Sequence, residues 1–493
     1  MQRIKLNRGR QNLRKERTEM MFRITVILFL SSWLLLGCDK SKTVSEVDKC
    51  WPEDFIISNS DDVATLKPYA CVKGNLWISA AEITAIDLPN LIRVDGNLQI
   101  AQNPRLTGLD GLSTLVSVGG NLSVYDNPSL ITLNGPSMLT SVGGRLSIEY
   151  NDFIANLDGL DSLAEIGGSL LVFGNPKLVS LLGLSTVVSV GKDLSISNNG
   201  ALTNLNGLNA LTSVTKDLSI KHNKSLVNLN GLNALTFVGN DISLEFNDSL
   251  VTLSGPGSLT SVGNNLSIGH NNSLVNLDGL NLLTSVGYDL NIKNNDSLVN
   301  LEGLNLLTSI GYDLNIRDNN SLVNLKGLNA LTSVGYDLNI IGNDSLVNLE
   351  GLDSVTLLHA TLHIENNNSL INCKGLNHDL SKISSVYFRN NAGLESLEGF
   401  NLEMTKWLVI ANNNVLTDLS ALNDAKKIEY AEVTDNAILT ECEVCLILRL
   451  LIKTFNNINN ISTELIEKGN FDGNLKDDCS PLPNNCVPPL SNN

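Results

Sequence analysis

One short sequence that returns at a fixed interval constrains this chain more than any other feature. Residues 289–292, 313–316 and 337–340 all read Asp-Leu-Asn-Ile, and each is followed by an asparagine three positions on and then by Ser-Leu-Val-Asn-Leu. Such a 24-residue repeat is typical of a solenoid, in which each repeat forms one rung that contacts only its neighbours. The 493 residues therefore predict one long repeat domain rather than several globular domains.

The same repeat predicts one short β-strand per rung. An apolar-x-apolar pair recurs in sixteen rungs from Ile78 to Val433, and its spacing is constant from Ile100 to Phe388. This alternation is typical of a strand with one buried face. Two further apolar clusters per repeat bring the chain back, and the corner residues are glycine and asparagine rather than helix formers. We expect a mostly β solenoid of parallel strands with tight corners and at most short helical turns.

Two positions of the repeat, one occupied by glycine and one by asparagine, explain how tight corners can form. Glycine occupies one of them from Gly111 to Gly399, which suits a positive φ or a close approach of two backbones. Asparagine occupies the other, where an inward side chain can satisfy backbone groups that a bend leaves unpaired. This predicted asparagine ladder continues at Asn413 and Asn436, and its regular part comprises Asn103, Asn127, Asn151, Asn175, Asn199, Asn223, Asn247, Asn271, Asn295, Asn319, Asn343, Asn367 and Asn391.

The first rungs resemble the receptor L domain. Residues 72–78, 94–100 and 118–124 read Val-Lys-Gly-Asn-Leu-Trp-Ile, Val-Asp-Gly-Asn-Leu-Gln-Ile and Val-Gly-Gly-Asn-Leu-Ser-Val. The Leu-x-Ile-x-x-Asn-x-x-Leu core is also similar to the leucine-rich repeat, with one extra residue after the asparagine. The resemblance extends over residues 50–440 and implies a right-handed β-helix. The repeat itself indicates about 16 rungs, many more than the receptors have, and we expect short helical caps at both ends. It also implies a binding role, but no particular ligand.

The N-terminus carries the signals of an exported protein. The uncharged, mostly apolar segment from Ile24 to Gly37 is too short to span a bilayer as a helix, which indicates a secretory signal peptide over residues 1–37. Translation from Met20 or Met21 is an alternative start. Residues 35–38, Leu-Leu-Gly-Cys, resemble the bacterial lipobox, which implies that Cys38 is diacylated and becomes the mature N-terminus. The alternative is an ordinary signal peptide with a chance cysteine.

The predicted lipid anchor places the protein in the cell envelope of a Gram-negative bacterium. Asp39, directly after Cys38, resembles an inner-membrane retention signal of enteric bacteria, whereas other Gram-negative groups use charged residues there for surface export. We expect a lipid-anchored protein of the outer membrane that is exposed on the cell surface. The other predicted segments are a polar tether at 38–49, an N-terminal cap at 50–75, the solenoid at 76–440, and a C-terminal cap and tail at 441–493.

Charge excludes one class of partner. Residues 1–37 hold eight basic and two acidic residues, so the 34 basic and 51 acidic residues of the whole chain fall to 26 and 49, a net charge of −23. Nucleic-acid binding requires a basic footprint, so we expect no nucleic-acid partner. The predicted protein is a monomer whose partners are the membrane, through its anchor, and an unknown protein or glycan.

The cysteines are predicted to close the two caps. Cys50 and Cys71 bracket the N-terminal cap, and Cys373 takes a leucine position of the repeat, where a buried free thiol is expected. Four more cysteines follow the last rung, and an exported protein would use them for disulfides. A zinc or redox site at the Cys-x-x-Cys pair is the alternative. These four are Cys442, Cys445, Cys479 and Cys486.

The sequence contains no constellation typical of an enzyme. No Ser/His/Asp set, phosphate-binding loop or metalloprotease motif is present, so we expect no catalytic residue, cofactor or metal site. His222 and His270 share a repeat position, but two rungs place them about 9.6 Å apart, too far to share a metal ion. The aspartates at 289, 313 and 337 would repel one another unless hydrated, hydrogen-bonded or bound to an ion such as calcium. Three Asp-Ser-Leu segments, at 248–250, 296–298 and 344–346, are similar to an O-glycosylation signal of some Gram-negative bacteria.

Departures from the repeat mark the candidate ligand-binding residues. Most strands place serine, asparagine or a charged residue at the outward positions, but two groups break that habit. Exposed aromatic clusters often mark interfaces, although a neighbouring loop or cap can also cover them. We predict a lipid-anchored extracytoplasmic binding or adhesion solenoid; a β-helix carbohydrate-active enzyme and a passive structural spacer are the alternatives. The candidates are Tyr125, Leu171 and Phe173 near the start, and His363, Tyr387 and Val409 near the end.

Overall fold

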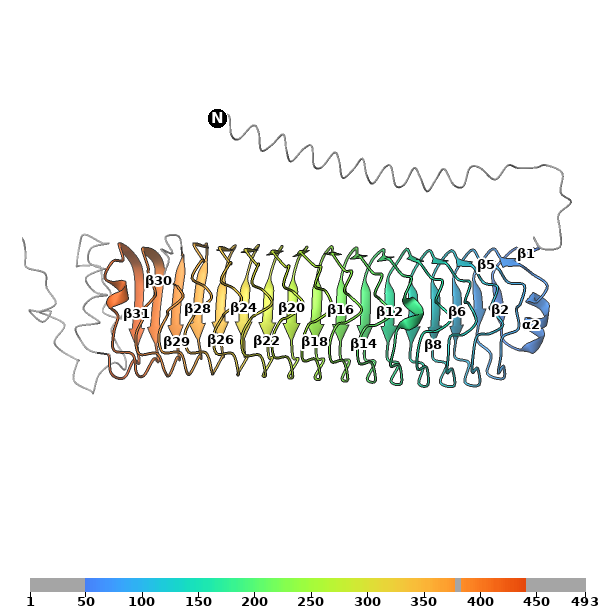
Figure 1. Ribbon diagram of the computed structural model, residues 1–493, viewed down its shortest axis with the longest axis horizontal. Coiled ribbons are helices and arrows are strands. Elements are labelled where there is room, and N and C mark those ends of the chain that lie inside the picture. Colours follow the sequence, from blue (N-terminus) through green and yellow to red (C-terminus); the bar gives the residue numbers. More distant parts are fainter. Residues whose placement is uncertain (1–48, 377–382, 440–493) are drawn as a thin grey trace, which may run out of the picture. The chain divides into compact units, whose positions relative to one another are not determined.

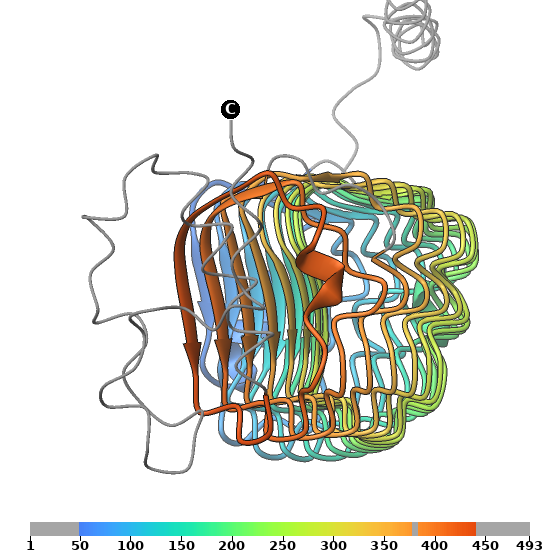
Figure 2. The same cartoon turned by 90° about the vertical axis from the view of Figure 1, so that its left-hand side faces the viewer.

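The computed structural model describes residues 49–376 and 383–439, and this part of the chain is a parallel β-solenoid with one rung for each repeat (Figure 1). The predicted fold class is confirmed. Each rung contributes one strand to a long sheet, here called the major sheet, and most rungs contribute a second, shorter strand to a minor sheet. Viewed from the end, the rungs lie over one another, with the major sheet forming one side (Figure 2).

The major sheet contains seventeen of the described strands, all parallel and stacked in chain order. Leu290 pairs with Leu314 and Ile292 with Ile316, so neighbouring strands are offset by one repeat. The sheet is open, because β2 and β31 each pair with a single neighbour. Its strands are β2 (Phe55–Ile57), β4 (Leu76–Ile78), β6 (Leu98–Ala101), β8 (Leu122–Tyr125), β10 (Leu146–Glu149), β12 (Leu170–Phe173), β14 (Leu194–Ser197), β16 (Leu218–Lys221), β18 (Ile242–Glu245), β20 (Leu266–Gly269), β22 (Leu290–Lys293), β24 (Leu314–Arg317), β26 (Leu338–Ile341), β28 (Thr361–Glu365), β29 (Ser385–Arg389), β30 (Met404–Ala411) and β31 (Lys427–Thr434).

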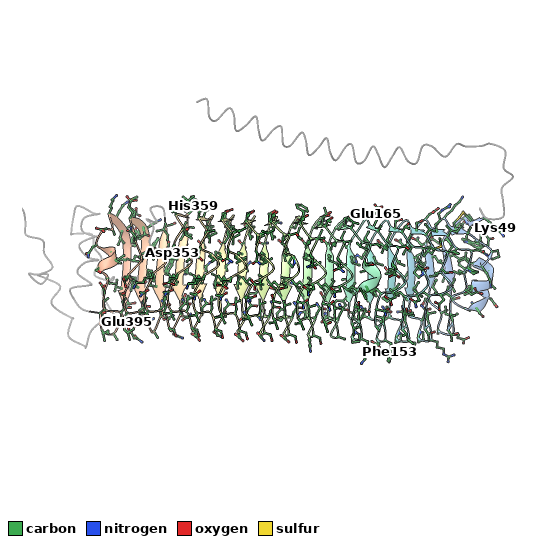
Figure 3. The ribbon with its side chains drawn as sticks, in the orientation of Figure 1. Lys49, Phe153, Glu165, Asp353, His359 and Glu395 are labelled. Atoms are coloured by element: carbon green, nitrogen blue, oxygen red, sulfur yellow. A yellow bond between two sulfur atoms is a disulfide. The ribbon has the colours of Figure 1, made fainter. Side chains whose placement is uncertain are left out.

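The minor sheet contains 14 strands of two residues each. Each lies a few residues before a major strand, and Figure 3 shows Glu165 of this sheet on the opposite long edge from Phe153, which follows a major strand. The strands are β1 (Cys50–Trp51), β3 (Cys71–Val72), β5 (Arg93–Val94), β7 (Ser117–Val118), β9 (Ser141–Val142), β11 (Glu165–Ile166), β13 (Ser189–Val190), β15 (Ser213–Val214), β17 (Phe237–Val238), β19 (Ser261–Val262), β21 (Ser285–Val286), β23 (Ser309–Ile310), β25 (Ser333–Val334) and β27 (Leu357–Leu358).

A short helix, α2 (Ser60–Leu66), covers the N-terminal end of the stack (Figure 1). Asn59 caps it, because its side chain accepts hydrogen bonds from the backbone N–H groups of Asp61 and Asp62. The segment predicted to be only a cap also contains β2, which adds one rung to the sixteen that the sequence indicates. Ile57 and Ile78 pair although fewer residues separate them than in the regular repeat. The period of the other rungs therefore does not reveal this pairing. The rest of the described chain adds two 3-10 turns, Leu182–Leu184 and Ser420–Leu422.

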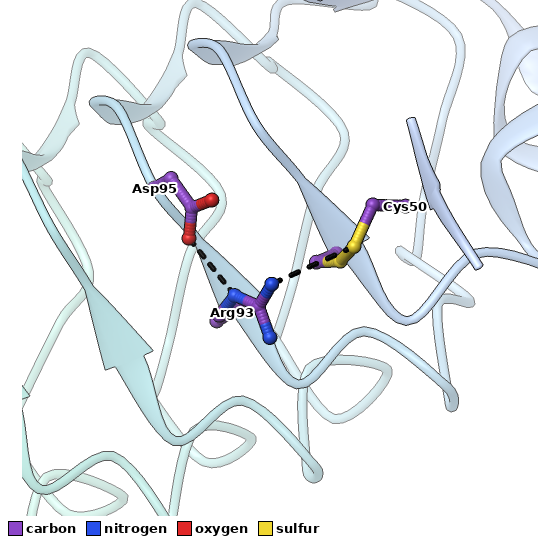
Figure 4. The surroundings of a disulfide bond; sticks show 4 residues. Cys50, Arg93 and Asp95 are labelled. Atoms are coloured by element: carbon purple, nitrogen blue, oxygen red, sulfur yellow. Dashed lines mark hydrogen bonds and ion pairs between the residues drawn. A yellow bond between two sulfur atoms is a disulfide. The ribbon is translucent and has the colours of Figure 1, made fainter. Parts of the chain in front are cut away.

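The predicted Cys50–Cys71 disulfide is confirmed and joins the first two strands of the minor sheet. Beside it, Arg93 donates a hydrogen bond to Cys50 Sγ at 3.6 Å and another to Asp95 Oδ1 at 2.9 Å (Figure 4). Cys373 is free, and its burial raises the pKa of its thiol. The predicted C-terminal cap, its four cysteines and Cys38 lie outside the described residues.

The core is one continuous column of leucine, isoleucine and valine that runs through the described rungs. Inward residues such as Leu314 and Ile316 are fully buried. A small apolar cavity interrupts the packing near the N-terminal end, where Pro136 takes the position that Leu112 and Leu160 hold in the adjacent rungs. Because no polar group lines it, this cavity offers nothing to hold a water molecule.

Asparagine side chains point into the corner that follows fifteen of the seventeen major strands, from β6 to β31, and all fifteen are fully buried. The Nδ2 group of Asn319 donates to the carbonyl oxygens of Ile292 and Arg317, both at 3.0 Å. Its Oδ1 accepts from the backbone N–H of Asn295 at 3.1 Å. The residue before each asparagine reverses the chain by taking a left-handed conformation, as Asp318 does at φ 54°.

Candidate binding surface

The outward face of the major sheet is predominantly polar and built from short side chains. Serine or asparagine lies between the two buried positions in most strands, as sequence analysis predicts. The asparagines bond along the stack: Asn315 Nδ2 donates to Asn291 Oδ1 at 2.9 Å, and Asn339 Nδ2 donates to Asn315 Oδ1 at 2.8 Å. Large side chains on this face therefore project beyond the short serine and asparagine side chains around them.

The two rings of the first predicted cluster contact neighbouring side chains of the chain. Tyr125 and Phe173 are half-buried, and the hydroxyl of Tyr125 accepts a hydrogen bond from Gln99 Nε2 at 2.9 Å. Phe173 lies edge-to-face with Tyr150, with ring centroids 5.2 Å apart. The Tyr150 ring occupies the space above Gly174, where an added Cβ would come within 3.1 Å of it. Leu171, half-buried, lies on the same strand, β12.

The second predicted cluster is only partly at the surface. His363 and Tyr387 are half-buried and stacked, with centroids 4.5 Å apart, and Arg389 lies over the Tyr387 ring at 4.9 Å. Burial lowers the pKa of His363, although the carboxylates of Asp337 and Glu365 oppose that shift.

The prediction that Val409 faces solvent is wrong, because Val409 is buried and only 4% exposed. It pairs with Tyr387 on one side and with Glu432 on the other. Its short side chain therefore lies between two longer ones on the neighbouring strands.

Two residues that sequence analysis misses complete this end of the face. Trp407 and Tyr430 are stacked with centroids 4.4 Å apart and an interplanar angle of 16°, and they are 44% and 42% exposed. They occupy the position just before the buried apolar pair of the strand, whereas the candidates predicted from the sequence lie between or after that pair. A tryptophan directly before Leu408 is the signal that could have revealed them.

The same register produces two further aromatic stacks that the sequence analysis did not identify. Tyr312 lies between Tyr288 and Tyr336, at 4.6 and 4.7 Å, with all three rings nearly parallel. Equivalent positions on adjacent parallel strands lie about 4.8 Å apart, which is within the range for ring stacking. A tyrosine that recurs once per repeat therefore becomes a column of rings.

The histidines form part of the second stack. Phe246 lies between His222 and His270, at 4.6 and 4.3 Å. Its ring separates the two imidazoles, so they share no metal ion. Nowhere in residues 49–376 and 383–439 do three His, Cys, Asp or Glu side chains come together in a way that could hold a metal.

The aspartate ladder is held by hydrogen bonds. Asp289 Oδ1 accepts from the backbone N–H of Asp313 at 3.1 Å, Asp313 Oδ1 from that of Asp337 at 3.0 Å, and Asp337 Oδ1 from that of Thr361 at 2.9 Å. Burial and the charges of Asp337 and Asp289 raise the pKa of Asp313, although the bond from Asp337 opposes this shift. Of the three arrangements that the sequence allows for these aspartates, the structure shows hydrogen bonding to the next rung.

Comparisons with known proteins find distant structural neighbours but no related sequence family. No family model and no curated protein matches this chain. The solved TLR13–ssRNA13 complex is similar over 82% of this chain and 75% of that chain, at 14% identity and a TM-score of 0.27. A leucine-rich repeat protein from Bacteroides ovatus ATCC 8483 is similar over 62% of this chain and 87% of its own length, at 15% identity and a TM-score of 0.20.

The observed fold itself defines the class: a parallel β-solenoid whose rungs enclose one apolar core. Within the described residues, no helix combines the length and the apolar character that crossing a membrane requires.

Proposed function

We propose that this protein is a lipid-anchored, extracytoplasmic binding solenoid that recognises its ligand through the outward face of the major sheet. The observation that supports this proposal is the group of aromatic side chains at one end of that face, namely His363, Tyr387, Trp407 and Tyr430. Tryptophan and tyrosine are the residues that most often dominate binding energy at interfaces. On a face where serine and asparagine predominate, they offer a ligand a large aromatic contact area.

A binding role fits the rest of the described chain better than an enzymatic one. A polysaccharide-cleaving enzyme needs carboxylates and a basic group placed together where the reaction occurs. The aspartates at 289, 313 and 337 instead bond the backbone of the next rung. No observation specifically favours the enzyme or the spacer.

The anchor rests on Cys38. We expect Cys38→Ser to leave the protein unprocessed or free of the membrane, because the thiol is the group that would carry the lipid. Metabolic labelling with a fatty-acid analogue measures this: the wild-type chain should take up the label and Cys38→Ser should not. A wild-type chain that stays unlabelled would remove the anchor from the proposal.

The binding face can be tested with aromatic-to-serine variants of the full chain on an array of glycans and proteins. Tyr387→Ser should weaken binding at least tenfold, because it removes a ring from the aromatic end of the major sheet. Phe237→Ser is the matched control, since Phe237 is 49% exposed but belongs to the minor sheet. The Tyr125→Ser/Phe173→Ser double variant reports on the first predicted cluster, at the other end of the face.

The array results separate the faces. Binding that survives Tyr387→Ser but is lost with Phe237→Ser would move the ligand to the minor sheet. Binding lost only in the Tyr125→Ser/Phe173→Ser variant, with its fold intact by circular dichroism, would move it to the N-terminal end of the major sheet.

A further inference from the structure

We propose that the open face of the Trp407 indole is a stacking site for one pyranose unit of a neutral glycan. The inference rests on the proposed function and names the ligand class and the side chain that would contact it. Trp407 pairs in register with Ser385 on one neighbouring strand and with Tyr430 on the other.

The stack with Tyr430 fixes which face of the indole is available. The two rings are 4.4 Å apart and nearly parallel, so Tyr430 covers one face of Trp407. The opposite face is directed toward β29, where the register partner is Ser385. Trp407 remains 44% exposed, so the neighbouring serine does not cover it.

Small side chains continue beyond Ser385. Thr361 holds the same register position on the next strand, and Asp337 lies one position before Leu338 on the strand after that. Parallel strands lie about 4.8 Å apart, so Asp337 is about 14 Å from Trp407 along the solenoid axis. Trp407 therefore forms a step above the short side chains of Ser385 and Thr361, which hold its register position on the next two strands.

The groups around this step suit a sugar. Within residues 49–376 and 383–439, Trp407 Nε1, Ser385 Oγ and Thr361 Oγ1 form no hydrogen bond to the protein, so donors and acceptors are available beside the apolar ring. A pyranose offers an apolar C–H face to an aromatic ring and hydroxyl groups around its rim. Binding sites of this kind combine an apolar wall with a few polar groups that fix orientation.

The surroundings favour a neutral glycan over a peptide strand or a polyanion. The step lies on strands that are already paired on both sides, so it offers no free sheet edge for an added peptide strand. The chain carries a net charge of −17, which repels an acidic polysaccharide.

Two other stacked rings lack this combination. Both faces of Tyr312 are covered by Tyr288 and Tyr336. Tyr387 is stacked on His363 and carries Arg389 over its ring. Trp407 combines an open face with hydroxyl-bearing neighbours, and this combination assigns the site to it.

The test uses the full chain with three six-residue neutral oligosaccharides, of glucose, mannose and galactose, and with polygalacturonate as the acidic comparison. Titration is followed by calorimetry and by tryptophan fluorescence. At least one neutral oligosaccharide should bind and change the fluorescence, and polygalacturonate should bind at least tenfold more weakly. Trp407→Ser should weaken the binding at least tenfold, whereas Trp407→Phe should retain part of it.

A second variant keeps the test independent of how Trp407→Ser folds. Ser385→Phe leaves the indole in place and fills the step, so it should also weaken binding at least tenfold. Tyr288→Ala, which removes a ring that is 46% exposed several strands away, is the control and should bind as the wild type does. The proposal is overturned if no neutral oligosaccharide binds the wild type, or if Ser385→Phe binds as tightly as the wild type.

The result also separates this inference from the broader proposal. If the oligosaccharides fail to bind while a protein on the array binds in a manner that Tyr387→Ser abolishes, the face is a protein-binding surface and the sugar site does not exist. If neither kind of ligand binds the wild-type face, both proposals fall.

Discussion

Gly327→Ala is expected to destabilise the solenoid by about 3 kcal/mol or more, although it adds a single methyl group. Gly327 has a φ of 115°, which side-chain-bearing residues rarely adopt, and an added Cβ would lie 1.9 Å from the carbonyl oxygen of Leu301 on the preceding rung. Neither the carbonyl nor the corner can move without shifting the neighbouring rung. Each rung contacts only its neighbours, so the loss should begin locally.

Two measurements follow this effect. The urea midpoint should fall, and amide hydrogen exchange should speed up first in the rungs on either side of Gly327. Gly257→Ala is the matched control, because Gly257 has no atom within 4 Å of an added Cβ. Its free energy of unfolding should change by less than about 0.5 kcal/mol. Equal effects of the two substitutions would contradict the close approach at the Gly327 corner.

The repeat period carries most of the fold, because it sets the register directly. Once Leu290, Leu314 and Leu338 are recognised as equivalent, parallel pairing at one strand spacing follows, and the structure has that register. The glycine and asparagine positions are predictable for the same reason. The geometry that a corner demands repeats in every rung, so the residue that meets it repeats as well.

The sequence reveals less where the period changes. β2 pairs with β4 across a shortened step and lacks the corner asparagine, so the regular pattern does not reach it. The two last described repeats near the C-terminal end are also shorter than the regular period. Their strand pairing brings Trp407 and Tyr430 into the register position that Ser385 holds on β29. Only the pairing of the strands shows that their rings are stacked.

Burial on the outward face also depends on more than the repeat. Val409 has the outward position that the alternation predicts, yet the side chains on its two neighbouring strands are longer and it is buried. Tyr125 and Phe173 break the repeat as a binding residue might, but Gln99 and Tyr150 use them for packing within the chain. Period-2 alternation gives the direction of a side chain, whereas its exposure depends on the size of the residues one rung away.

Asn319→Ala is expected to cost about 3–4 kcal/mol, because one truncation leaves several buried groups without partners. Asn319 Nδ2 donates to Ile292 O, Arg317 O and Asn343 Oδ1, and its Oδ1 accepts from the backbone N–H and the side-chain Nδ2 of Asn295. The side chain is fully buried, so water cannot replace it without opening the corner. The substitution removes an element that links three successive rungs.

Asn320→Ala is the control one position along. Asn320 is exposed, and its amide donates to Asp296 Oδ1 at 3.2 Å on the surface, where water can take over the bond. We expect a change below about 0.5 kcal/mol. The comparison is made by urea denaturation, with amide exchange reporting on the backbone N–H of Asn295, which should lose protection only in Asn319→Ala. If Asn319→Ala proves as mild as Asn320→Ala, the inward ladder does not stabilise the corners, and the apolar core alone must hold the rungs in register.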